Sequence, residues 1–462
     1  MLDEAGRQFS HGPTSAEVQE AMHAVGPPPS VLAEGVLAVV EQGPNVQPTV
    51  DVWISAGPRS SVNWLGQALP AGEEISCDQG STESCRIYRL RLNILARTAT
   101  VTKVQDLTGM GMGSVQPAVD ASGRQLATVI NRGKSANGNY PAAVGLLLDD
   151  GGGWPIFLRE PVGPSARRPA KPTFWGAKRV LWTSNVGGEL DDNSPSWWWA
   201  NLMQSNLASG SAPSVLLGGP EGENSDSNPP PPCEANPDWP SADCVSWRDA
   251  QVHPNPAALS HLVAAEWVTV FGRHGVDPLA AEGRPIVARL PDGSAIQEFD
   301  LGNGNEGDSI VGCHHPAWSI TGGEIACTRE KSFDDTVGLE LDVHGLYGFR
   351  FPNFGRWQNQ GEVIRSTDVR GDPDFPHFHG LAYSGNDHPV LSYKYATWVA
   401  SDRWIAATVF ITQGGSHNVL MSRVVLFDTT GAEAPLDLVE FVEDAEGATR
   451  GEWRAVSSEA RR

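Results

Sequence analysis

Histidine is the polar residue type whose spacing in this sequence says most about chemistry. His377 and His379 are separated by one residue, and alternate residues of a β-strand point to the same face. Both imidazoles could therefore hold one divalent metal ion. The alternative is a pair of hydrogen-bonded or surface histidines that hold no metal.

Two other segments carry side chains that suit binding. Trp197, Trp198 and Trp199 are consecutive, so a strand would place the first and third on one face. An exposed indole could stack on a sugar ring or anchor a protein partner, whereas a central strand would bury all three in the core. The acidic, glycine-rich run 300–308 could bind Ca²⁺, although it lacks the EF-hand spacing and an ordinary turn is the alternative.

Several function classes are disfavoured by what the sequence lacks. It contains no Gly-x-Ser-x-Gly nucleophile motif, no phosphate-binding Walker loop and no dinucleotide-binding glycine fingerprint. The net charge is −22 and no basic stripe is visible, which argues against a nucleic-acid partner. No apolar run approaches about 18 residues, so we expect no transmembrane helix.

The six cysteines indicate disulfides and hence an oxidising compartment. They fall into three close couples: Cys77 with Cys85, Cys233 with Cys244, and Cys313 with Cys327. A hairpin turning near Thr321 would place the last couple opposite each other across two strands, at a separation that a disulfide can bridge. Buried free thiols are the alternative.

The N-terminal segment bears on localisation. Residues 1–30 are polar and lack the apolar centre of a signal peptide. Either a removed signal is missing from this sequence, or the protein stays inside the cell. Three local disulfides favour the first interpretation, and we therefore expect a periplasmic or extracellular protein.

One sequence phrase recurs and predicts the elements that would position these residues. It consists of a proline, a spacer, an aromatic or apolar residue, a polar turn, and an apolar pair followed by small residues. Clear copies occupy 116–128, 315–327 and 396–408, and looser copies occupy 171–182 and 253–264. Each copy predicts two short strands joined by a tight turn. Alternating apolar residues predict a third strand in several units, at 144–148, 286–290 and 422–427.

Repeated antiparallel meanders of roughly 50–80 residues bury both faces when they pack around a ring, as in a β-propeller. The phrase resembles the TolB-like propeller repeat, whose family form is Pro-x-Trp-Ser-Pro-Asp-Gly followed by Ile-Ala-Phe. The resemblance covers about 114–441 and is best at Trp318, Ser319, Gly323, Ile325 and Ala326. It implies an all-β fold and leaves the function open.

The number and closure of the blades follow from where the units begin. Units begin near residues 115, 171, 252, 314, 379 or 395, and 450, which predicts six blades, with a seventh at 375–394 as the alternative. Segments 35–40, 50–55, 86–92 and 450–454 read as strands of one blade shared by both termini. We thus expect an extension at 1–30 and one propeller domain at 31–462, with a proline-rich acidic insert at 219–247 stapled by Cys233 and Cys244.

In such a propeller, the residue before the proline of each phrase would begin an innermost strand, and these strand starts would gather at one mouth of the central channel. The predicted binding residues at this mouth are Gln116, Lys171, His253, His315, Tyr395 and Arg450.

A second resemblance concerns a metal. The stretch Asp374-Phe-Pro-His377-Phe-His379 is similar to the Gln-x-x-His-x-His stretch of metal-dependent oligogalacturonate lyases, which are TolB-like propellers. It implies a manganese site formed by Asp374, His377 and His379 with His315 as the channel histidine, where aspartate replaces the family glutamine. Carboxylate oxygen is an acceptable manganese ligand. Zinc and calcium are the other divalent ions we consider.

Three functions remain open from the sequence. The first is an exported, non-catalytic propeller that serves as a binding platform for another protein or a saccharide. The second is a metal-dependent enzyme resembling the polysaccharide lyases, which requires His315, His377 and His379 to converge. The third is a subunit of a larger extracytoplasmic assembly that docks through its long insert and the tryptophan triplet.

Overall fold

The computed structural model of this chain describes only part of its residues. These are 49–63, 65–71, 74–77, 83–132, 142–148, 156–158, 167–186, 200–207, 212–217, 245–254, 262–270, 281–293, 295–298, 310–320, 322, 324–331, 343–350, 362–364, 389–400, 403–413, 419–428 and 432–460.

Regular structure in these residues is almost entirely antiparallel β-sheet. The strands form six sheets of four strands each. The first sheet consists of β24 (Trp453–Ala460), β1 (Thr49–Pro58), β2 (Arg86–Asn93) and β3 (Thr98–Gln105), and the second of β4 (Met112–Val119), β5 (Gln125–Arg132), β6 (Ala142–Leu148) and β7 (Ile156–Leu158). The third consists of β8 (Arg167–Trp175), β9 (Arg179–Val186), β10 (Ala200–Asn206) and β11 (Ser214–Leu217), and the fourth of β12 (Val245–Val252), β13 (Leu262–Val270), β14 (Ala281–Arg289) and β15 (Ala295–Glu298). The fifth consists of β16 (Ile310–Trp318), β17 (Glu324–Lys331), β18 (Val343–Arg350) and β19 (Glu362–Ile364), and the sixth of β20 (Pro389–Trp398), β21 (Trp404–Gln413), β22 (Val419–Asp428) and β23 (Leu436–Asp437).

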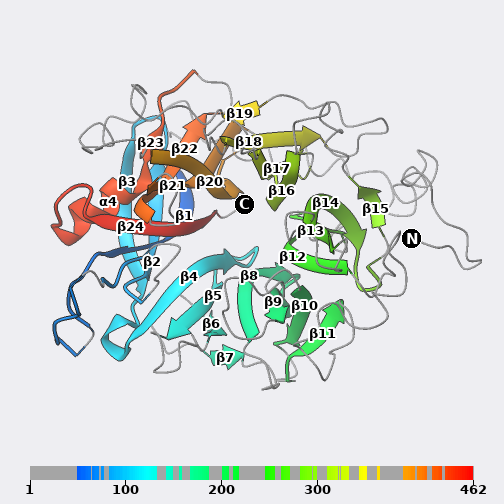
Figure 1. Cartoon of the computed structure of the whole chain (residues 1–462), viewed down its shortest axis with the longest axis horizontal. Coiled ribbons are helices and arrows are strands. Elements are labelled where there is room, and N and C mark those ends of the chain that lie inside the picture. Colours follow the sequence, from blue (N-terminus) through cyan, green and yellow to red (C-terminus); the bar gives the residue numbers. More distant parts are fainter. Residues whose placement is uncertain are drawn as a thin grey trace, which may run out of the picture.

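The six sheets are arranged about a common centre, like the blades of a propeller (Figure 1). One strand of each sheet lies nearest this centre, and we call these six strands the inner strands: β24, β4, β8, β12, β16 and β20. Each inner strand contacts the next in this order, and β20 contacts β24. The predicted all-β, propeller-like architecture is therefore confirmed at this level.

The two ends of the described chain meet in one sheet. Strand β24 pairs antiparallel with β1, with Ser457 opposite Ser55 and Trp453 opposite Pro58. The sequence predicted this shared sheet, although its last strand begins at Trp453 instead of residue 450. The predicted strand at 35–40 lies outside the described residues.

Burial on both faces explains why the strands read as nearly continuous apolar segments. Six consecutive residues of β1, from Val52 to Gly57, are buried, and Trp53, Trp182 and Trp318 are among the largest fully buried side chains. A sheet packed between two neighbours loses solvent on both faces, and burial contributes about 25 cal/mol per Å² of apolar area. The repeated tryptophans therefore act mainly in packing between sheets.

Hydrogen bonds to an aspartate side chain fix the tight turn between β4 and β5. After β4, Asp120 Oδ1 accepts hydrogen bonds from the backbone N–H of Arg124 (2.9 Å) and Gln125 (2.8 Å). Gly123 has φ of 71°, a conformation that favours glycine. Ala121 and Ser122 stand where the TolB-like phrase has Pro and Asp. Asp120, which directly precedes them, supplies the hydrogen-bond acceptor that stabilises this turn.

Within the described residues, neither a one-turn 3-10 helix, η1 (Thr108–Met110), nor an α-helix was predicted. Helix α4 (Leu438–Glu446) begins after Asp437, whose side chain accepts a hydrogen bond from the N–H of Val439, and ends at Gly447 with φ of 68°. These are standard start and stop signals. The helix was missed in the sequence because its apolar residues, Leu438, Val439 and Val442, resemble those of the neighbouring strands.

The disulfide predictions had mixed outcomes. Cys77 and Cys85 form a disulfide, as predicted, whereas Cys233 and Cys244 lie outside the described residues. The register of β16 and β17 pairs Cys313 with Arg329, two residues beyond Cys327, so these two cysteines are not directly opposite. The expected position was wrong because a hairpin that turns at Thr321 pairs Cys313 with residue 329, and Cys327 falls opposite the bulge between His314 and Ala317; their bridge stays a prediction.

The described residues contain no helix long and apolar enough to cross a membrane. The proposed extension at 1–30, most of the insert at 219–247 and most of the segment read as a seventh blade, 375–388, lie outside these residues.

Candidate functional site

Five inner strands share an unusual backbone feature. Each has a β-bulge near its middle, at a non-glycine residue with positive φ: Gln116 (52°), Lys171 (42°), Asp249 (48°), His315 (55°) and Tyr395 (54°). This backbone conformation costs about 1 kcal/mol or more of conformational free energy in a non-glycine residue, and it persists only where the surrounding structure holds it in place. A bulge also redirects a side chain, so these residues depart from strict in-out alternation.

Four of the six predicted mouth residues occupy these bulges: Gln116, Lys171, His315 and Tyr395. The sequence placed them at the starts of strands, and the structure corrects this to mid-strand. A proline follows three of them, Gln116, Lys171 and His315. Because a proline without its N–H is accommodated both at a strand start and at a bulge, the sequence alone did not distinguish the two positions.

His253 does not occupy the equivalent position. The bulge of β12 is at Asp249, whereas His253 follows the strand and is buried, with its ring 4.6 Å from that of Trp318 and its Nε2 3.3 Å from the carbonyl oxygen of Gly322. His253 thus packs between the fourth and fifth sheets. The prediction chose His253 because Pro254 follows it, whereas the bulge in β12, at Asp249, is followed by Ala250 and contains no proline.

Arg450 also lies away from the bulges. It precedes β24, its side chain is 62% exposed, and its guanidinium lies 3.8 Å from Glu440 and 3.6 Å from Asp444 of α4. In β24 the register shift falls at Val456, between Ser457 and Ala455. The structure therefore replaces His253 and Arg450 by Asp249 and Val456 at the six equivalent positions.

Hydrogen bonds link every inner strand to the next. In order around the sheets they are Gln116 N to Ser457 Oγ (2.8 Å), Lys171 N to Gln116 Oε1 (2.7 Å), Val252 N to Thr173 Oγ1 (3.3 Å), Trp318 N to Gln251 Oε1 (2.6 Å), Trp398 Nε1 to Ala317 O (3.2 Å) and Thr397 Oγ1 to Ser458 O (3.0 Å). Two of these bonds have the backbone N–H of a bulge residue as donor, that of Gln116 and that of Lys171, and they help to hold these two bulges in place.

A small polar cavity lies among these strands. Residues of β4, β8, β12, β20 and β24 line it, and its polar side chains include Gln116, Lys171, Gln251, Tyr395 and Glu459. Its volume is about 40 Å³, which is room for about three water molecules. In the described part of the chain, the cavity therefore suits a small charged or polar group and is too small for a sugar ring.

A chain of side-chain contacts crosses the centre beside this cavity. His315 Nδ1 lies 2.5 Å from a carboxylate oxygen of Asp249, and the His315 ring lies 4.5 Å from the ring of Tyr395. The ammonium of Lys171 lies 5.8 Å from the centroid of the same Tyr395 ring, within the range of a cation–π contact. Side chains of four sheets thus hold one another in position, with charges of both signs.

Of the four residues predicted to bind a metal, the structure describes His315. Asp374, His377 and His379 lie outside the described residues, as do Trp197, Trp198, Trp199 and the acidic run 300–308. The carboxylate of Asp249 orients the His315 imidazole, as carboxylates do for many metal-binding histidines. No group of three or more metal-binding side chains occurs within the described ranges. Convergence of His315 with His377 and His379 stays a prediction.

Comparison with known proteins gives similarity of fold only. No protein-family model and no curated protein matches the sequence. Similar solved structures include a protein of Agrobacterium tumefaciens assigned as TolB, with 11% identity over 85% of this chain and 89% of that one and a TM-score of 0.38. Another is an oligogalacturonate lyase in complex with manganese, with 11% identity over 76% of this chain and 69% of that one and a TM-score of 0.37. A third is hydrazine synthase of Kuenenia stuttgartiensis, with 9% identity over 89% of this chain and 47% of that one and a TM-score of 0.47. At these identities and TM-scores they assign this chain to no family.

Proposed function

We propose that this chain is an exported, non-catalytic binding platform built on a closed, six-bladed, TolB-like propeller. The observation that carries the proposal is the convergence of polar side chains from five sheets on one small cavity, held in place by mutual contacts. Groups fixed in this way lose little further entropy when a ligand binds, which favours binding.

Closure and blade number are inferred from the contacts between sheets. The cyclic contacts of the inner strands and the pairing of β24 with β1 fit six blades that share one closing sheet. Closure protects sheet edges that would otherwise pair with other chains. The Cys77–Cys85 disulfide fits an oxidising compartment and thus export.

The size and polarity of the cavity restrict which chemical groups of a ligand it can hold. We infer that a protein partner, or a saccharide bound across the ring, inserts one small charged or polar group between Lys171 and Glu459. Lys171 would contact an anionic group and Glu459 a cationic one, so the cavity accepts either sign in different orientations.

Variant-dependent cross-linking tests this proposal. Wild type, Lys171→Glu and the exposed control Arg450→Glu are cross-linked in native cell extract, and their partners are identified by mass spectrometry. We expect a partner that wild type and the control retain and Lys171→Glu loses. A partner profile that is identical for all three proteins would contradict binding at the cavity.

The Asp249–His315 contact supports a second candidate, a metal-dependent enzyme of the polysaccharide-lyase kind. A carboxylate that fixes the tautomer of an imidazole suits a metal ligand or a general base. Elemental analysis of the purified protein tests it, together with assays on polygalacturonate in added manganese. Near-stoichiometric metal that is lost in His377→Ala/His379→Ala would favour the enzyme over the platform.

A further inference from the structure

The Cys77–Cys85 disulfide occupies a special place relative to the closing sheet. It lies in the connection between β1 and β2, and both cysteines are fully buried. Its neighbours in the core come from other sheets: Val115 and Val129 from the second, and Phe410 from the sixth. The disulfide therefore packs where the closing sheet meets the blades on both of its sides.

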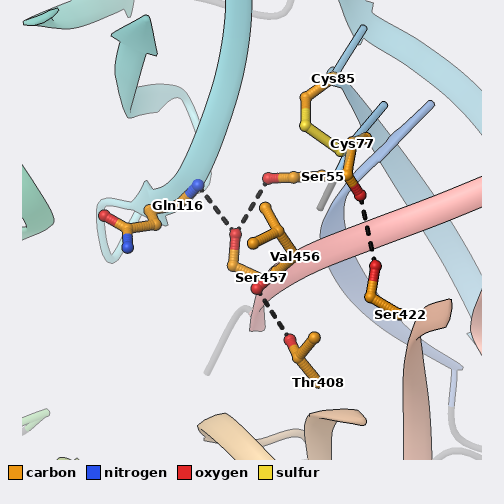
Figure 2. The surroundings of a disulfide bond; sticks show 8 residues. All are labelled: Ser55, Cys77, Cys85, Gln116, Thr408, Ser422, Val456 and Ser457. Carbon is orange, nitrogen blue, oxygen red and sulfur yellow. Dashed lines mark hydrogen bonds between the residues drawn. A yellow bond between two sulfur atoms is a disulfide. The ribbon is translucent and has the colours of Figure 1, made fainter. Parts of the chain in front are cut away.

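Backbone groups of the two cysteines bond to those same neighbouring sheets, and Figure 2 shows the bond between Cys77 and Ser422. The carbonyl oxygen of Cys85 accepts a hydrogen bond from Ser114 N of β4 (3.0 Å), and that of Cys77 accepts one from Ser422 Oγ of β22 (3.4 Å). One short disulfide-bonded loop thus joins the second sheet to the sixth across the first.

The loop is seated directly on the strands that close the ring. A Cβ at Gly57, near the end of β1, would overlap the carbonyl oxygen of Ser84, so only glycine allows the loop to lie this close. Val456 of β24 packs in the same cluster, and its carbonyl oxygen accepts a hydrogen bond from Thr408 Oγ1 (2.9 Å).

The loop also adjoins the central cavity through these strands. Val115 precedes Gln116, Val456 precedes Ser457, and Tyr395 packs partly against the same cluster as the disulfide. Ser457 Oγ in turn lies 3.1 Å from Ser55 Oγ and accepts the hydrogen bond from Gln116 N.

We propose that the Cys77–Cys85 disulfide is an oxidation-dependent lock, which fixes the closing sheet between its two neighbours and thereby completes the central cavity. In forming it, the two thiols lose two protons and two electrons to a disulfide oxidant, whose two sulfur atoms leave as thiols. The inference rests on the proposed function only in that export supplies the oxidising compartment.

Hydrogen exchange measured by mass spectrometry tests the lock without any ligand. We compare oxidised wild type, wild type reduced with a phosphine, and Cys77→Ala/Cys85→Ala, with Cys233→Ala/Cys244→Ala as the matched control. A disulfide that closes so short a loop shifts a local opening equilibrium by roughly 10- to 100-fold. We expect exchange faster by that factor in β24 and the start of β4 in both reduced wild type and Cys77→Ala/Cys85→Ala, and little change in β13 and β14. The oxidised control should exchange like oxidised wild type, and oxidised glutathione should restore slow exchange in the reduced wild type.

Two outcomes would overturn the lock. Unchanged exchange in β24 and β4 after reduction would show that the seam closes without the disulfide. Uniformly faster exchange in all six sheets would show a general contribution to stability with no role at the seam. Neither outcome bears on the partner cross-linking experiment, so failure of the lock and failure of the proposed function are distinguishable.

Discussion

The carboxylate of Glu443 accepts two parallel hydrogen bonds, each of 2.9 Å, from the guanidinium of Arg423. Both side chains are buried, and Arg423 Nε also lies 2.7 Å from Asp437, the residue that caps α4. Glu443 Oε1 accepts a further bond from the backbone N–H of Trp453, where β24 begins (2.8 Å). This cluster therefore ties α4 and β24 to β22.

Breaking this pair is expected to be costly. Burial alone lowers the pKa of Arg423, but the carboxylates of Asp437 and Glu443 outweigh it and raise the pKa, so the guanidinium stays charged. Glu443→Gln removes one compensating charge and should lower the free energy of unfolding by about 3 kcal/mol, measured by urea denaturation. The exposed control Arg450→Ala should change it by less than about 0.5 kcal/mol. Equal effects of the two substitutions would contradict this assignment.

Gly322 and His253 form a second contact that a substitution can test. Gly322 has φ of 74°, and a Cβ there would overlap Nε2 of the buried His253. Gly322→Ala should therefore destabilise the protein by about 1–3 kcal/mol more than Gly176→Ala, whose φ of 64° is similar but which has open space for a Cβ. Thermal and urea unfolding of both variants measure the difference.

A double variant isolates the clash at this site. Combining His253→Ala with Gly322→Ala should recover part of the stability that Gly322→Ala loses, since the overlapping ring is gone. Strictly additive losses would show that the overlap with His253 is not the cause.

Asp106 gives a prediction about pH. Partial burial by itself raises the pKa of Asp106, but hydrogen bonds from Thr108 and the charges of Arg86 (3.0 Å) and Lys103 (3.6 Å) outweigh it and lower the pKa. A carboxyl with a lowered folded-state pKa stabilises the fold above its unfolded pKa, and this contribution disappears as the pH falls through the folded pKa.

The corresponding measurement compares Asp106→Asn with wild type across pH. At pH 7 the variant should be less stable by about 1 kcal/mol, and the difference should shrink as the pH falls from about 5 to 2. Thr108→Val, which removes the hydroxyl donor at 2.6 Å, should show part of the same loss. A difference between Asp106→Asn and wild type that is independent of pH would rule out this carboxylate as its source.

The repeated phrase made much of the fold predictable. Its proline, aromatic residue and apolar pair are local signals for strand, turn and strand, and they located the hairpins of β4–β5, β16–β17 and β20–β21. The shared sheet of β24 and β1 was predictable too, because an unpaired strand at each end of a repeat array can be buried only by the other.

The site was less predictable, because its positions depend on bulges and not on sequence distance alone. Where a proline marks the bulge, at Gln116, Lys171 and His315, the residue was found, and Tyr395 was found by analogy with them. Asp249 was missed because Ala250 stands where the proline would be. The contact between Asp249 and His315 joins two sheets, and no local pattern predicts such a pair.

The proposed closure of the ring depends on the sheet that β1 and β24 share, and an engineered disulfide between these two strands tests it most directly. Ser55 and Ser457 are directly opposite, with their hydroxyl oxygens 3.1 Å apart although 402 residues separate them in sequence. The control pair Ile54→Cys/Ser457→Cys places the two thiols on opposite faces of the sheet.

Ser55→Cys/Ser457→Cys should form a disulfide spontaneously under oxidising conditions, seen as a linked peptide pair in mass spectrometry, and the control pair should not. Absence of the Ser55→Cys/Ser457→Cys link, or equal linking in the control pair, would contradict closure through β1 and β24.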